Sequence, residues 1–128
     1  MEIVQIVILA VTGLFLTLIG TLRIINPIAN YSKNSGIKLE NDVNLLNEMR
    51  GVSSVMLCGG VIILLGTIIP DLTITSFVVA SLIFLGFAIG RFISIAVDGK
   101  PNKQITQGIM FELVFGAANL FGLYSILT

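Results

Sequence analysis

Three residues that could do chemistry stand inside apolar segments of this sequence. Arg91 lies in GFAIGRFISIAV, Glu112 in GIMFELVFG and Glu48 in LLNEMRGV. At a helical rise of about 1.5 Å per residue, each lies about 9–12 Å inside its predicted helix. Ionisable groups at this depth of a membrane protein either pair with one another or mark a functional site.

Helical spacing indicates which other polar residues share a face with these three. Residues seven apart lie on one face of a helix, which joins Asp98 to Arg91 and Asn119 to Glu112. Glu48 and the neighbouring Arg50 lie about 200° apart around a helix, so both cannot point at one site. We expect Arg91 to pair with Glu112 or Glu48. The candidate ligand-binding residues are Glu48, Arg50, Arg91, Asp98, Glu112 and Asn119.

Two interpretations of this polar layer stay open. A salt-bridge network could only fix the register of the helices, since buried ionic groups can confer specificity without adding stability. Alternatively, the layer lines a polar pocket that opens to the cytoplasm. Asn119 favours the pocket, because it lies deeper than the charges and a salt-bridge network near the surface does not need it.

Composition excludes several classes of function. The chain has no histidine, no tryptophan and one cysteine, Cys58. A zinc site, a CxxC pair and a Ser-His-Asp triad therefore lack their parts, and we expect neither a metal nor another cofactor. With seven basic and seven acidic residues, the chain also has no basic block for nucleic acid.

The elements that position these residues are predicted to be transmembrane helices. Residues are 55% hydrophobic and 11% charged, where a soluble domain has about 25% charged residues. Apolar segments at 3–25, 42–69, 72–97 and 104–127 are each long enough to span a bilayer. We read the first as a retained helix, because Glu2 stands where a signal peptide needs a basic residue. The prediction is an all-α, four-helix integral membrane bundle forming one domain over 1–128.

The connections predict how the bundle is oriented. All seven Lys and Arg residues lie in or near the first and third connections, and none lies in the second or at the C-terminus. By the positive-inside rule, those two connections face the cytoplasm and both termini are extracytoplasmic. We expect a multi-pass protein of the cell inner membrane. The longer first connection could carry a short interfacial helix around 28–33.

Small residues indicate how the helices approach one another. Gly86 and Gly90 have GxxxG spacing, which we expect to serve packing within the chain rather than a dimer face, although a homo-oligomer stays an alternative. Gly108 and Gly116 flank Glu112 by one turn on each side and would let another helix come close to it.

Several of these segments resemble one family. NEMRG at 47–51, GRFISIAVDGKP at 90–101 and Glu112 in the last helix resemble small four-helix bacterial membrane proteins catalogued as a domain of unknown function. A weaker similarity is to DoxX-like membrane proteins. The resemblance spans residues 13–127, implies a four-helix bundle and points at the same charged residues. It implies no activity.

Four functions fit these features. The first is a binding module whose charged cavity in the cytoplasmic leaflet holds a small amphipathic molecule or the headgroup of a membrane lipid. The second is a small proton-coupled exporter that uses Glu112. The third is a lipid enzyme with Glu48 and Glu112 as acid and base, but no nucleophile or cofactor motif supports it. The fourth is a structural or partner subunit. We favour the binding module.

Overall fold

The computed structural model describes all residues, 1–128, and is all-helical. Its elements are α1 (Ile3–Ile25), α2 (Pro27–Ser35), α3 (Val43–Leu65), the short 3₁₀ helix η1 (Pro70–Leu72), α4 (Thr73–Asp98) and α5 (Lys103–Leu127). The four long helices are apolar and long enough to cross a membrane, as the sequence predicts. The second of them ends at Leu65 rather than at residue 69, and the expected short helix in the first connection is present as α2.

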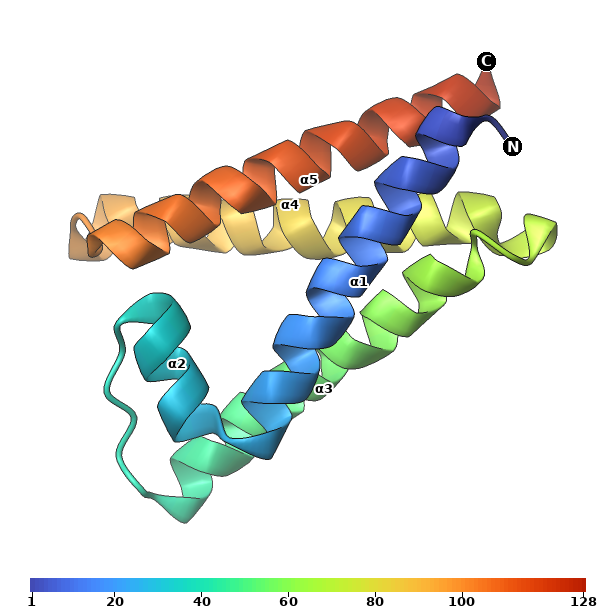
Figure 1. The fold of residues 1–128 in the computed structure, drawn as a ribbon. Coiled ribbons are helices and arrows are strands. Elements are labelled where there is room, and N and C mark those ends of the chain that lie inside the picture. Colours follow the sequence, from blue (N-terminus) through green and yellow to red (C-terminus); the bar gives the residue numbers. More distant parts are fainter.

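The four long helices form two pairs that diverge towards one end. α1 packs chiefly on α3, and α4 packs chiefly on α5. Figure 1 shows the pairs close together near the two termini and spread apart at the opposite end, where α2 lies on the open side. The shape is therefore a V, and its open end is the place where a cavity can form.

Glycines hold α1 and α3 together along their length. A Cβ on Gly20 would lie 2.7 Å from the backbone nitrogen of Leu57, and one on Gly60 would lie 2.7 Å from the backbone nitrogen of Thr17. Without side chains, these glycines let the two backbones approach closely, which is the usual packing of small residues between membrane helices.

The closed part of the V contains the apolar core. Leu9, Leu16, Ile63, Phe77 and Phe84 are almost completely buried there. Most other large apolar side chains face outward along all four long helices. An outer surface of this kind requires lipid as its solvent, so the fold is that of a membrane protein.

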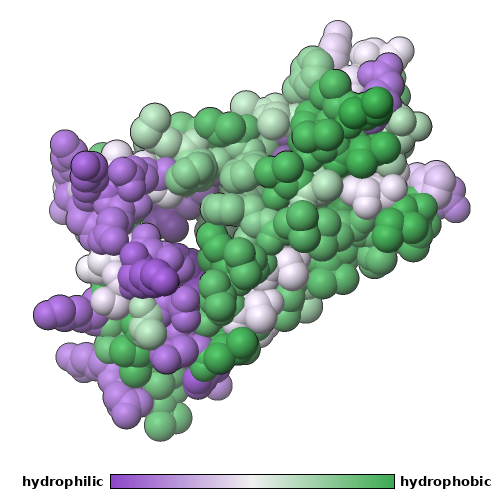
Figure 2. Space-filling model, in the orientation of Figure 1, coloured by the Kyte–Doolittle hydropathy of each residue, from purple (hydrophilic) through white to green (hydrophobic).

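The two ends of the molecule differ in polarity. The chain termini lie together at the closed end, where the Gln5 amide donates to the Ser125 hydroxyl at 2.9 Å. Figure 2 shows most hydrophilic residues gathered at the open end, over α2 and the α4–α5 connection, with a smaller group near the chain termini and hydrophobic residues over most of this face. The open end therefore lies at or near the aqueous phase.

Local signals place α2 across the open end. Asn26 ends α1 and caps α2, because its side chain accepts a hydrogen bond from the Ala29 amide. Gly36 ends α2 in the left-handed conformation, at φ 66°, which glycine adopts at low cost. Side chains from the start of α5 then hold the end of α2: the amides of Asn102 and Gln104 donate to the carbonyls of Ser35 and Lys33.

Candidate functional site

A cavity of about 430 Å³ lies inside the open end of the V. This volume is within the range of small-molecule sites, about 300–1,000 Å³. Residues from α1, α2, α3, α4 and α5 line it, and they divide into a polar and an apolar group. The polar group includes Arg23, Tyr31, Ser35, Arg91, Gln104, Gln107 and Glu112. The apolar group is Phe15, Leu16, Ile19, Val52, Met56, Phe84, Phe87 and Phe111.

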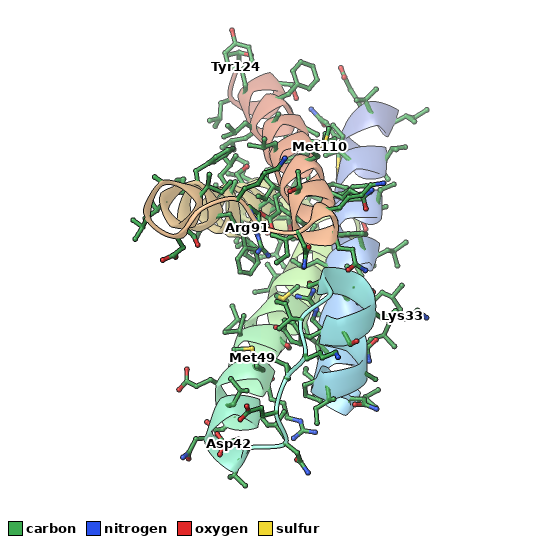
Figure 3. All side chains as sticks on the ribbon, turned by 90° about the vertical axis from the view of Figure 1, so that its left-hand side faces the viewer. Lys33, Asp42, Met49, Arg91, Met110 and Tyr124 are labelled. Atoms are coloured by element: carbon green, nitrogen blue, oxygen red, sulfur yellow. The ribbon has the colours of Figure 1, made fainter.

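Arg91 and Glu112 form an ion pair in the wall of this cavity. The Arg91 Nε donates to the Glu112 Oε1 at 2.7 Å, and this is the only ion pair in the structure. Viewed from the open end, Arg91 lies beside α4 on the side facing α5 (Figure 3). Of the two acids expected as its partner, Glu112 is the one in contact. The other carboxylate oxygen, Oε2, is buried and has no hydrogen-bond partner in the protein.

Arg23 is a second cation of the cavity, and no carboxylate pairs with it. Its guanidinium carbon lies 4.2 Å from the centre of the Tyr31 ring, a cation–π contact. Its Nη2 donates to the Ser35 hydroxyl at 3.1 Å, while its Nε is buried without a partner. Two residues of α2 therefore orient Arg23 and leave donor capacity unused.

On α1 and α4 the apolar residues lie deeper in the cavity than the cations, because both helices run towards the open end and these residues precede Arg23 and Arg91. Leu16 and Phe84 belong both to this wall and to the buried core, so the cavity ends where the two helix pairs meet. Phe15 and Phe84 each stack against Phe115 at centroid distances of 5.0 and 5.1 Å. The cavity is thus apolar towards the membrane interior and charged towards the open end.

Three of the expected site residues lie outside this cavity. Glu48 is exposed on α3 and makes no ion pair. Arg50 is also exposed, and its Nε donates to the carbonyl of Ile24 at 2.9 Å, so it satisfies the end of α1. Asp98 is exposed at the end of α4 and accepts a hydrogen bond from Ser94. These three residues lie at the open end, as Arg91 does, but the fold does not place them in the cavity wall.

Asn119 is completely buried and does not line the cavity. Its Nδ2 donates to the Thr12 hydroxyl at 3.0 Å and to the Phe115 carbonyl at 2.8 Å. The first of these bonds joins α5 to α1 in the closed part of the V. The depth of Asn119 was expected to indicate a pocket. It is explained instead by these hydrogen bonds within and between helices.

The glycines around the site behave differently from one another. Gly116 packs closely on Leu85 of α4, as expected, but a Cβ on Gly108 would meet no atom within 4 Å, and Gly108 lines the cavity instead. The expectation that Gly86 and Gly90 pack within the chain is wrong, because a Cβ there would also meet nothing. These two line a second hollow, of about 420 Å³, between α4 and α5.

Sequence reasoning missed the part of the site that α1 and α2 supply. Arg23 lines the cavity and was not among the candidate residues. Tyr31 and Ser35 carry no signal of their own. Both are buried only because α2 turns back over the open end.

The sequence of this chain matches a known protein family. The profile of the family described as "Domain of unknown function (DUF4345)" matches residues 4–123. The chain belongs to this family. Comparisons with curated proteins and with solved structures found no match. The match to the family contains every residue that lines the cavity, so the cavity lies wholly within the family domain.

Proposed function

We propose that this protein is a membrane-embedded binding module, whose cavity at the open end of the V holds a small amphipathic molecule or a lipid headgroup. The observation that carries the proposal is the division of the cavity wall: on α1 and α4 the cations lie nearer the open end and the aromatic and aliphatic groups lie deeper. An amphiphile has the same two parts in the same order. A few polar groups in a mainly apolar pocket are typical of small-molecule sites.

The cavity supports the interpretation of the polar layer as a site rather than as a purely structural salt-bridge network. A salt bridge that only fixes the register of the helices needs the contact between Arg91 and Glu112 and nothing more. In this fold the contact forms one wall of a large cavity, and Arg91 itself remains 35% exposed. Support for binding also comes from Arg23, which contributes a cation that the ion pair does not use.

The charge distribution supports an orientation for the site. The basic residues of the α1–α3 and α4–α5 connections, Lys33, Lys38, Lys100 and Lys103, lie towards the open end, while Glu2 and Asp71 lie near the closed end. With the positive-inside rule, we place the cavity in the cytoplasmic leaflet of a bacterial inner membrane and both termini outside the cytoplasm. The ligand would then enter from the cytoplasm or from that leaflet.

Filling the cavity tests the proposal. Gly108→Leu would put an apolar side chain into the cavity from a position where a Cβ meets no atom. Gly51→Leu is the matched control, since Gly51 is an exposed helical glycine of α3 that also meets no atom and lies outside the cavity. Native mass spectrometry of the delipidated proteins with dodecyl phosphate would measure binding.

We expect one saturable dodecyl phosphate adduct on the wild type and on Gly51→Leu, and its loss on Gly108→Leu. Circular dichroism would verify that all three proteins keep their helix content. Equal binding by Gly108→Leu and Gly51→Leu would show that the amphiphile binds elsewhere and would contradict the proposal.

A further inference from the structure

We propose that the cavity selects a headgroup that carries both an anionic phosphodiester and a hydroxyl donor, with Arg23 binding the anion and the free Oε2 of Glu112 accepting from the hydroxyl. This inference rests on the proposed function, because it names the chemistry of the molecule that the cavity holds. Both groups line the same cavity, and each has hydrogen-bonding capacity that the protein does not use.

The sign of the headgroup follows from the charges of the wall. Arg23 and Arg91 are cationic and Glu112 is anionic, so the side chains that face the cavity sum to one positive charge. Lys33 also lines the cavity, but its side chain points outward from α2 (Figure 3), so we do not count its charge. Arg23 lies in the last turn of α1, is partly buried and has no counter-ion, so a ligand anion would offset the cost of burying its charge.

Arg23 is prepared for an anion by its neighbours. Ser35 takes one donor, and the Tyr31 ring covers one face of the guanidinium. A guanidinium has five N–H donors in a planar fork, which suits the oxygens of a phosphate. Because the contacts with α2 hold the group in place, little side-chain freedom remains to be lost when the anion binds.

Glu112 adds the second requirement, a hydrogen-bond donor. Its residue surface is only 7% exposed, and the salt bridge to Arg91 uses Oε1 alone. An ionised carboxylate accepts hydrogen bonds at both oxygens, and leaving one buried and unpaired is unfavourable. A hydroxyl on the headgroup would satisfy Oε2, whereas a bare phosphate ester would bring its own negative charge towards it.

A quaternary ammonium group cannot meet this requirement. It has no hydrogen to donate, and its positive charge would lie near Arg23 and Arg91. The inferred order of preference is therefore phosphoglycerol, then methyl phosphate, then phosphocholine, at constant chain length. The order depends on the headgroup and not on the apolar wall, which all three ligands would contact equally.

Three probes with one chain test this order. Dodecylphosphoglycerol has the anion and hydroxyls, dodecyl methyl phosphate has the anion alone, and dodecylphosphocholine has neither a donor nor a net charge. We expect the first to bind the wild type about tenfold more tightly than the second, the factor that one hydrogen bond to a charged group supplies. Glycerol 3-phosphate without a chain distinguishes a free phosphate ester from a lipid; we expect it to bind more weakly than all three.

Variants assign the two roles. Arg23→Gln should weaken both anionic probes about tenfold or more and keep the ratio between them. Lys100→Gln, which removes a cation outside the cavity, should leave both affinities unchanged. Glu112→Gln should lower the ratio of the two anionic probes, because the neutral amide replaces a charge-assisted hydrogen bond to the hydroxyl with a weaker neutral one.

The outcomes separate this inference from the proposed function. Equal affinities of the wild type for all three probes, with binding still lost in Gly108→Leu, would overturn the headgroup selection and leave the binding module intact. Binding that survives in Gly108→Leu would overturn both. The comparison of probes on the wild type needs no variant, so it decides the inference even if Glu112→Gln does not fold.

Discussion

The Nε of Arg91 lies 2.7 Å from the Oε1 of Glu112, which joins α4 to α5 in the wall of the cavity. The two residues come from neighbouring membrane helices, and each alone would be a charge in an apolar segment. Their contact makes the polar layer tolerable in lipid. It also leaves the far oxygen of Glu112 without a hydrogen-bond partner in the protein.

A double-mutant cycle on this pair should show strong coupling. Arg91→Met and Glu112→Met each leave one charge unpaired, which costs about 3–5 kcal/mol for a fully buried pair. Because Arg91 is 35% exposed, we expect a smaller loss of about 1–3 kcal/mol for each variant. The double variant should lose less than the sum of the two, since no charge is left unpaired. Reversible unfolding in mixed detergent would measure these free energies, and strict additivity would show that the pair contributes nothing.

Close packing of α1 on α3 gives a second prediction. A Cβ on Gly20 would lie 2.7 Å from the Leu57 nitrogen and 2.9 Å from the Ser53 oxygen, and these backbone atoms cannot rotate away. Gly20→Ala should therefore separate the helices and cost about 1–3 kcal/mol.

Gly51→Ala is the control, because alanine there meets no atom and has the higher helix propensity. We expect its melting temperature to equal or exceed that of the wild type, while that of Gly20→Ala falls. A fall of the same size in both variants would mean that the loss does not come from the contact between α1 and α3.

The fold was predictable where lipid restricts the alternatives, and the site was predictable only in part. Long apolar segments in a bilayer must be helices, so α1 was predicted from 3 to 25 and is observed from Ile3 to Ile25. Helical spacing placed Arg91 and Glu112 at one depth, and depth was enough to bring them together. Depth does not fix the direction around the bundle, which is why Glu48 was expected at the site and lies outside it. Asp98 was expected because it shares a helix face with Arg91, but it lies at the exposed end of α4. The contribution of α2 to the cavity wall depends on how the polar connection between α1 and α3 folds back over the open end. The periodicity of the sequence does not predict the direction of that fold.

Orientation in the membrane is a prediction of the charge distribution alone. In a Cys58→Ala background, cysteines placed at Lys38 and Lys103 should react with a membrane-permeant maleimide and should not react with an impermeant one added to intact cells. A cysteine at Thr128, beside the other terminus, should react with both. Labelling of the Lys103→Cys variant by the impermeant reagent would reverse the orientation of the cavity.

The closure of the cavity by α2 gives the last prediction. The Asn102 amide donates to the Ser35 carbonyl at 2.9 Å, and the Gln104 amide donates to the Lys33 carbonyl at 3.1 Å. Asn102 also caps α5 through its side-chain oxygen, so Asn102→Asp keeps a capping oxygen and removes the donor. Combined with Gln104→Ala, this change should release the end of α2 from α5.

Hydrogen–deuterium exchange would measure the release. We expect faster exchange of the amides in α2 in the double variant, because local opening needs fewer contacts to break. Exchange in α1 and α3 should not change, since these two helices pack on each other along their length. Asn47→Ala is the control, because Asn47 is exposed on α3 and its side chain makes no hydrogen bond.

Since Tyr31 and Ser35 orient Arg23 from α2, the double variant should also bind dodecyl phosphate more weakly. Faster exchange with unchanged affinity would show that α2 covers the cavity without ordering the cation inside it.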